Sequence, residues 1–317
     1  MAVPTSMMAL RAHTRGGPEV LVYERAPVPV PAADEVLVAV HAASITFTEL
    51  TWDDTWLRDG VDRTPVVPAH ELAGRVVATG GPEVDLEVGD EVYGLVRFDR
   101  DGAAAEYVAV PAADLAAAPR STSAVRTAAL PLAGLTAWQA LHDLAGVRPG
   151  EDVLVHGGAG GVGAFAVQLA DAAGAHVTST ARATDRALVE RLGARTVVDF
   201  EHEAFDAAGR AYDVVVDTVG GDTLDRSFGV LRPGGRLVTL QAPPDQDRAT
   251  EAGVTAVFFI VTPDRAQLDR LAELVDSGRL EVLVAAEYPL AAGREAFASV
   301  AGPHDVPGKT VLVVDRP

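Results

Sequence analysis

A glycine-rich segment at residues 158–163 has the composition of a phosphate-binding loop. It reads Gly-Ala-Gly-Gly-Val-Gly and fits the pattern G-x-G-x-x-G. The early glycines of this pattern permit a tight turn and let backbone N–H groups approach a pyrophosphate, while the last lets a helix pack closely on a strand. Because a strand is expected at 153–156 and a helix at 164–173, the helix amino terminus would face the anion. A glycine-rich turn that binds no ligand is the alternative. The predicted dinucleotide-binding residues are Gly158, Gly160, Gly161, Val162 and Gly163.

The residues at the end of the next expected strand bear on which dinucleotide binds. An NAD site normally has a carboxylate there, about 20 residues after the glycines. This strand, at 176–180, ends in Thr180 and leads to Arg182, with no carboxylate at its tip. The guanidinium of Arg182, with Thr180 and Arg186 nearby, can bind a 2′-phosphate through paired hydrogen bonds. Asp185 stands where the following helix begins and is expected to cap it. The sequence predicts NADPH, with a solvated loop arginine as the alternative for Arg182.

Alternating strands and helices must position this loop. Strands are expected at 153–156, 176–180, 196–200, 212–217, 236–240 and 254–261, and helices at 164–173, 185–192 and 263–277. Repeated strand–helix units imply a parallel, doubly wound sheet. The predicted fold class is therefore α/β.

A second, β-rich domain is expected in front of these units. Short β-branched runs at 20–23, 35–41, 71–79 and 91–95 are separated by Gly and Pro turns. Strand character returns over 280–317, and a terminal β segment most economically rejoins the first domain. We expect a β-rich domain of residues 1–121 and 279–317 and a nucleotide-binding domain of residues 122–278.

Composition excludes several classes of protein. The 317 residues include 26 Lys and Arg against 45 Asp and Glu, a net charge of −19, and no basic run exists that would bind nucleic acid. The chain has no cysteine, which excludes disulfides, thiolate zinc sites and a Cys nucleophile. The first ten residues do not read as a signal peptide, and the apolar stretches are too short for a membrane span. We expect a cytoplasmic protein that binds neither nucleic acid nor membrane.

Several motifs in order resemble the zinc-free, quinone oxidoreductase-like branch of the medium-chain dehydrogenase/reductase superfamily. His70-Glu71 with Gly74 resembles its G-H-E-x-x-G segment, in which Ala69 replaces the first glycine. Further matches are V-G-D-x-V at 88–92 and the segments 129–131, 135–141, 192–194, 217–221 and 308–309. The resemblance covers nearly the whole chain. It implies a GroES-like β-rich domain, a Rossmann domain, and NADPH in the cleft between them.

The same resemblance assigns roles to residues of the cofactor site. It implies that ribose and phosphates are held by Thr136, Gly160, Gly161, Val162 and Arg182. The residues implied near the nicotinamide are Leu240, Gln241, Phe259, Ile260 and Val261, and Thr218 belongs to a further family motif. Family members often form homodimers through the edge strand, here 254–261, whose apolar run would need covering.

Two departures from the family pattern concern catalysis. Zinc-dependent members use Cys ligands, and His70 with Glu71 would supply two ligands where catalytic zinc requires three. No metal is therefore expected, and His70 is expected to be buried and to donate a hydrogen bond to a carbonyl or carboxylate. In the loop after the third strand, Thr46 and Thr51 replace the Asn and Tyr of relatives. A threonine hydroxyl can orient a carbonyl but is a weak proton source.

An apolar substrate wall is expected beside these threonines. Trp52 and Trp56 could form it, together with Phe47 and Phe259, although packing within an irregular loop is the alternative for both tryptophans. The candidate catalytic residues are Thr46, Thr51 and Trp52, as groups that orient the substrate.

These features predict an NADPH-dependent, metal-independent oxidoreductase. A hydride would pass to a quinone or to an activated C=C bond of an enone or enoyl substrate, since a conjugated acceptor needs no strong acid beside it. The protein would then contribute orientation and exclusion of water. The alternative is a non-catalytic NADPH-binding protein with a structural or sensor role.

Overall fold

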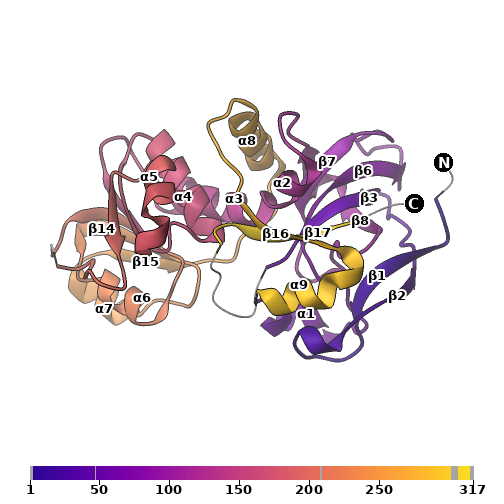
Figure 1. Ribbon diagram of the computed structural model, residues 1–317, viewed down its shortest axis with the longest axis horizontal. Coiled ribbons are helices and arrows are strands. Elements are labelled where there is room, and N and C mark those ends of the chain that lie inside the picture. The colour runs from indigo at the N-terminus through magenta and orange to yellow at the C-terminus, as the bar shows by residue number, and fades with distance from the viewer. Residues whose placement is uncertain (1–2, 47, 208, 301–305, 315–317) are drawn as a thin grey trace. The chain divides into compact units, whose positions relative to one another are not determined.

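A computed structural model describes residues 3–46, 48–207, 209–300 and 306–314 (Figure 1). Phe47, expected in the substrate wall, lies outside the described residues. The chain forms two compact units, one within residues 1–132, 262–277 and 282–317, the other within residues 133–261 and 278–281. Within the described part, no helix combines the length and the apolar character needed to cross a bilayer.

The first unit is built on a seven-stranded sheet. Its main path runs β16-β17-β3-β6-β7-β9, and β8 pairs with β3. The strands are β3 (Glu35–Ser44), β6 (Glu71–Thr79), β7 (Glu91–Leu95), β8 (Tyr107–Pro111), β9 (Leu115–Ala117), β16 (Val284–Pro289) and β17 (Lys309–Val313). Strand β3 lies inside the sheet and is buried on both faces, which explains its continuous apolar sequence.

Smaller elements complete this unit. Strands β1 (Ser6–Ala12) and β2 (Leu21–Pro27) form an antiparallel pair, as do β4 (Leu57–Arg58) and β5 (Val61–Asp62). Its helices are α1 (Asp53–Trp56), α2 (Ala124–Ala128), α8 (Arg265–Asp276) and α9 (Gly293–Ser299). The C-terminal strand β17 pairs antiparallel with β3, as Figure 1 shows in yellow and purple. This pairing confirms that the terminal β segment rejoins the first domain.

The second unit contains a six-stranded parallel sheet. Its strands, in spatial order, are β12 (Thr196–Asp199), β11 (His176–Ala181), β10 (Asp152–Val155), β13 (Tyr212–Asp217), β14 (Leu231–Thr239) and β15 (Thr255–Phe258). Its helices are α3 (Pro131–Trp138), which begins at the unit boundary, α4 (Gly161–Ala172), α5 (Arg186–Arg191), α6 (Gly221–Ser227) and α7 (Gln246–Ala252). From β10 the chain adds β11 and then β12 on one side. It then crosses back and adds β13, β14 and β15 on the other side of β10. The prediction of a doubly wound α/β sheet is confirmed, with its switch point between β10 and β13.

The compact units differ from the domain boundaries expected at residues 121 and 278, because helix α8 packs with the β-rich unit. The Tyr93 hydroxyl, on β7, donates to the Leu268 carbonyl at 2.5 Å. Arg265 donates to the carbonyls of Leu115 (2.5 Å) and Ala112 (2.7 Å) beside β9. Helical periodicity indicates α8 but does not show which sheet the helix covers.

Candidate functional site

The glycine loop joins β10 to α4 and leaves no room for a side chain at two of its glycines. A Cβ atom at Gly158 would lie 2.1 Å from Ser179 Oγ, and one at Gly163 would lie 2.0 Å from the Gly157 carbonyl oxygen. Larger residues are therefore excluded at both positions. Helix α4 begins directly after this turn, with Gly160 at its amino-terminal cap and no side chain bonded there. This backbone cradle fits the diphosphate of a dinucleotide.

A buried polar network lies beneath the loop. Ser227 Oγ donates to the Thr223 carbonyl at 2.7 Å, so at 3.1 Å from His156 Nε2 it must accept the histidine proton. Nδ1 of His156 is then an acceptor, 3.4 Å from Thr180 Oγ1. The same threonine oxygen accepts the Gly157 N–H at 3.0 Å. Burial lowers the pKa of His156 to about 4, so the imidazole is neutral at physiological pH and supports the loop through hydrogen bonds.

The predicted cofactor residues gather at the carboxyl edge of the parallel sheet. Arg182 directly follows β11 and Thr218 directly follows β13. Leu240 and Gln241 follow β14, and residues 259–261 follow β15, which ends three residues earlier than expected. Ligands of open α/β sheets bind outside this edge at the switch point. Thr136 lies in α3 of the same unit and is buried.

Asp217, the first residue of the family motif at 217–221, organises this edge. It is fully buried, and its Oδ1 accepts the N–H groups of Val219 and Gly220 at 3.0 Å. Its Oδ2 accepts a hydrogen bond from Thr239 Oγ1 at 2.9 Å. The neighbouring Gln241 amide donates to the Thr218 carbonyl at 2.9 Å. The carboxylate thus ties the end of β13 to the end of β14.

Two arginines lie near the end of β11. Arg186 donates to the Val197 carbonyl at 2.6 Å and to Glu203 Oε1 at 3.2 Å, so its guanidinium is held by the protein itself. Arg182 is half-buried in the connection that follows β11. Asp185 occupies the cap position of α5, but its side chain makes no capping hydrogen bond, so that expected role is wrong.

The candidate catalytic residues lie in the first unit. Thr46 is half-buried, and its Oγ1 has no hydrogen-bond partner among the described residues. Thr51 is exposed and its hydroxyl donates to the Thr48 carbonyl at 2.7 Å. The Trp52 ring meets the Phe98 ring edge-on, with 5.1 Å between centroids. Trp56 is only 2% exposed and donates to the Leu50 carbonyl, so it belongs to the core and not to a substrate wall.

Glu49, which is not among the predicted site residues, is a fully buried carboxyl beside these residues. It has no exposed surface and accepts the N–H groups of Thr46 (3.1 Å) and Ala69 (2.8 Å). Burial raises its pKa to about 7 against the effect of these two bonds. Ala69 holds a left-handed φ of 67°, the position where relatives have glycine. A glutamate three residues after Thr46, within the loop already singled out, is the signal that would have identified it.

His70 is buried as expected, and backbone hydrogen bonds at Val96 and Arg97 act on its ring, whereas its carboxylate neighbour is too distant to bond. Its Nε2 lies 3.8 Å from Glu49 Oε2, beyond hydrogen-bond length, and its Nδ1 has no partner in the described part of the chain. Burial, followed by the positive charge of Arg63, lowers the pKa of His70 to about 4. Glu71 accepts the Leu132 N–H at 3.0 Å and is ion-paired with Lys309.

The donor set around His70 does not fit a catalytic zinc ion. His70 and Glu49 supply two potential ligand atoms, and no described His, Asp or Glu brings a third within 4.8 Å of both. The described residues gather three such atoms at Asp199, Glu201 and His202, in the second unit. Three protein ligands are the minimum for catalytic zinc.

Known proteins resemble this chain over most of its length. The family model of the alcohol dehydrogenase GroES-like domain matches residues 32–120, and that of zinc-binding dehydrogenases matches residues 192–312. A probable mitochondrial zinc-binding oxidoreductase of Arthroderma benhamiae is 32% identical, over 93% of this chain and 93% of its own. The 2-methylene-furan-3-one reductase of Solanum lycopersicum is 31% identical, over 91% of this chain and 74% of its own. The solved quinone oxidoreductase of Coxiella burnetii has a TM-score of 0.90 at 29% identity, covering 98% of this chain and all of that one. The chain belongs to the medium-chain dehydrogenase/reductase superfamily, in its quinone oxidoreductase-like branch.

Membership confirms the resemblance inferred from the motifs. This quinone oxidoreductase-like protein is an oxidoreductase of a superfamily that uses a nicotinamide cofactor. The glycine loop, the amino end of α4 and the carboxyl edge of the sheet are the elements of the second unit that fit such a cofactor.

Proposed function

We propose that the protein is an NADPH-dependent reductase of quinones or of activated C=C bonds. The observation that carries the proposal is the glycine cradle at the switch point, combined with a β11 tip that carries Arg182 and no carboxylate. When bound, the reduced nicotinamide supplies a hydride. Resemblance to a quinone oxidoreductase and to a furanone reductase supports both acceptor classes.

The protein's own residues would bind and orient the cofactor. Backbone N–H groups of the glycine loop hold the diphosphate, and Thr136 binds ribose. Arg182 binds the 2′-phosphate, with Thr180 and Arg186 beside it. The residues proposed to frame the nicotinamide are Thr218, Leu240, Gln241, Phe259, Ile260 and Val261.

The candidate substrate residues suit a conjugated acceptor. The Thr46 hydroxyl, which has no partner among the described residues, can donate to a substrate oxygen, and the Trp52 and Phe98 rings offer an apolar surface. Hydride addition to a quinone or enone leaves an anion that conjugation stabilises, and solvent supplies the proton. Thr51 is a weaker candidate, because its hydroxyl already donates to Thr48.

Metal independence belongs to this proposal. The chain has no cysteine, and the donors around His70 number two. We expect purified protein to reduce menadione or an aliphatic enal with NADPH in the presence of EDTA, whereas a zinc enzyme would lose activity. Mass spectrometry of the enal product separates C=C reduction from quinone reduction. Tight NADPH binding without turnover of either acceptor would instead support the non-catalytic alternative.

Arg182 provides the test of cofactor choice. The variant Arg182→Ala should lower kcat/KM for NADPH by about tenfold to a hundredfold, the equivalent of one or two charge-assisted hydrogen bonds, and leave NADH use nearly unchanged. Arg191→Ala is the matched control, because that arginine lies on the following helix α5 and pairs with Glu281. An unchanged NADPH preference in Arg182→Ala would contradict the assignment.

We also propose a cytoplasmic homodimer that binds neither membrane nor nucleic acid. Strand β15 is the edge strand of the parallel sheet, and Val257 and Phe258 on it are half-buried. An unpaired edge of this kind invites pairing with a second copy. Light scattering that gives the mass of one chain would contradict the dimer.

A further inference from the structure

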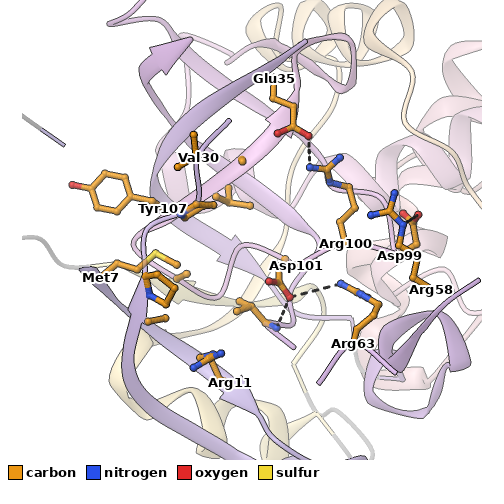
Figure 2. Close-up of a pocket in the computed structure, with 18 residues that line it drawn as sticks. Met7, Arg11, Val30, Glu35, Arg58, Arg63, Asp99, Arg100, Asp101 and Tyr107 are labelled. Atoms are coloured by element: carbon orange, nitrogen blue, oxygen red, sulfur yellow. Dashed lines mark hydrogen bonds and ion pairs between the residues drawn. The ribbon is translucent and has the colours of Figure 1, made fainter. Parts of the chain in front are cut away.

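The first unit contains a cavity outside the candidate substrate residues (Figure 2). Its volume is about 420 Å³, within the range of roughly 300–1,000 Å³ typical of small-molecule sites. Strands β1, β3 and β8 line it, together with residues from the segments 26–30, 58–67 and 99–105. Thr46, Thr51 and Trp52 are not among its lining residues.

Four arginines from three segments border this cavity: Arg11, Arg58, Arg63 and Arg100. Three carboxylates border it as well: Glu35, Asp99 and Asp101. The local balance is therefore four positive charges against three negative ones, in a chain whose net charge is −19. Arg11 is ion-paired with Glu24 at 3.0 Å and Arg100 with Glu35, which leaves Arg58 and Arg63 as the cations available to a ligand.

The arginine donors are only partly satisfied. The Arg58 Nε atom lies 3.7 Å from Asp99 Oδ2, too far for a hydrogen bond, and the guanidinium makes none with any described residue. Nη2 of Arg63 is likewise 3.7 Å from Asp101, although its Nη1 donates to backbone carbonyls. Each guanidinium has five N–H donors, so the cavity offers more donors than its own carboxylates accept. An oxyanion would use this surplus.

The carboxylates of the cavity are better satisfied than the arginines. Glu35 is paired with Arg100 through Oε1 and accepts the Ala32 N–H at 2.9 Å through Oε2. Asp101 Oδ1 accepts the Val67 N–H at 3.1 Å. Asp99 is the exception, since its nearest cation is Arg58 at 3.7 Å. A cationic ligand would compete with the existing bonds of Glu35 and Asp101, whereas an anionic one would meet Arg58 without breaking a hydrogen bond among the described residues.

The opposite side of the cavity is largely apolar. Figure 2 shows Met7, Val30 and Tyr107 on the side away from Arg58 and Arg63. A ligand that matches both sides has an anionic head and an apolar body. We propose that this cavity binds a small organic oxyanion whose head contacts Arg58 and Arg63 and whose body packs against Met7, Val30 and Tyr107.

Arg63 connects this cavity to the candidate substrate residues of the same unit. It is only 12% exposed, and its Nη1 donates to the carbonyls of Thr55 (3.1 Å) and Phe98 (3.2 Å). The Phe98 ring contacts Trp52 and also lies 5.3 Å from the His70 ring. A ligand that forms hydrogen bonds with the Arg63 guanidinium would therefore change the surroundings of Trp52, and tryptophan fluorescence would report its binding.

Phenylacetate is a suitable probe for the intact chain, with 2-phenylethanol as its neutral analogue and phenylethylammonium as its cationic one. We expect saturable phenylacetate binding by calorimetry, accompanied by a change in tryptophan fluorescence, and at least tenfold weaker binding of both analogues. Binding should persist in saturating NADPH and in Arg182→Ala, which separates this site from the predicted nucleotide site.

Charge reversal at Arg58 tests the location. Arg58→Glu should weaken phenylacetate binding at least tenfold, and because the side chain is 59% exposed the variant should fold. Arg75→Glu is the matched control, since Arg75 is 55% exposed and pairs with Glu91 away from the cavity. The proposal is overturned if wild-type protein shows no saturable binding, if the two variants bind equally, or if 2-phenylethanol binds as well as phenylacetate.

Discussion

The Glu49 carboxyl keeps its proton to a higher pH in the folded protein than in the unfolded chain. Burial raises its pKa to about 7, from an ordinary value of 4.5. Between these values the folded state binds more protons, so the free energy of unfolding should fall as pH rises, by up to about 1.4 kcal/mol per pH unit. Urea unfolding at pH 5 and pH 7 should show that Glu49→Gln removes this loss. The exposed Glu83→Gln variant is the control, and an equal change in both would contradict the prediction.

Residue types predicted the backbone of the glycine loop better than the packing of the loop around Thr46. Gly158 and Gly163 were identified because their spacing reflects a local backbone requirement. Glu49 was missed because its burial depends on Ala69, 20 residues later in the chain, whose N–H it accepts. Likewise, tryptophan is a residue type expected in an apolar substrate wall, and only the packing of the folded chain shows that Trp56 lies in the core.

At the scale of elements, the turn from β10 into α4 admits a direct test. Gly163→Ala would place a Cβ atom 2.0 Å from the Gly157 carbonyl oxygen. The three nearest atoms all belong to the backbone, so no side chain can rotate to remove the clash. The loop must therefore shift, and NADPH affinity should fall at least tenfold by fluorescence titration. Gly229→Ala is the matched control in the same unit, because its nearest atom would lie at 3.4 Å and its affinity should not change. Equal affinity in both variants would mean that the loop does not bind the cofactor.

Strand positions were largely predictable, whereas their partners were not. Alternating and β-branched runs gave β6, β7 and β13 with the bounds that the structure has. The strand expected at 236–240 begins earlier in the structure, because β14 starts at Leu231, which pairs with Tyr212. The placement of α8 with the β-rich unit depends on Tyr93 and Arg265, which are distant in sequence from their partners. Local patterns carry no information on such contacts.

At the scale of the whole molecule, the two units should respond differently to acid. His156 in the second unit and His70 in the first are both neutral when folded, with pKa values lowered by burial to about 4 from 6.5. Each binds more protons when unfolded, so each unit loses stability as pH falls from 6.5 towards 4. In the first unit Glu49 acts in the opposite direction between pH 7 and 4.5, and the two effects roughly cancel.

The second unit has no buried carboxyl of this kind with a raised pKa among its described residues. His142, whose pKa burial also lowers, adds to the loss there, and the raised pKa of His202, due to Asp199, opposes it only weakly because that side chain is 74% exposed. We therefore expect the second unit to open first between pH 7 and pH 5. Hydrogen exchange, corrected for its intrinsic pH dependence, should show a larger loss of protection in β10–β15 than in β3 and β6. His156→Gln should reduce the difference, because an amide in that place does not titrate, and an equal loss in both units of the wild-type protein would refute this account of its acid sensitivity.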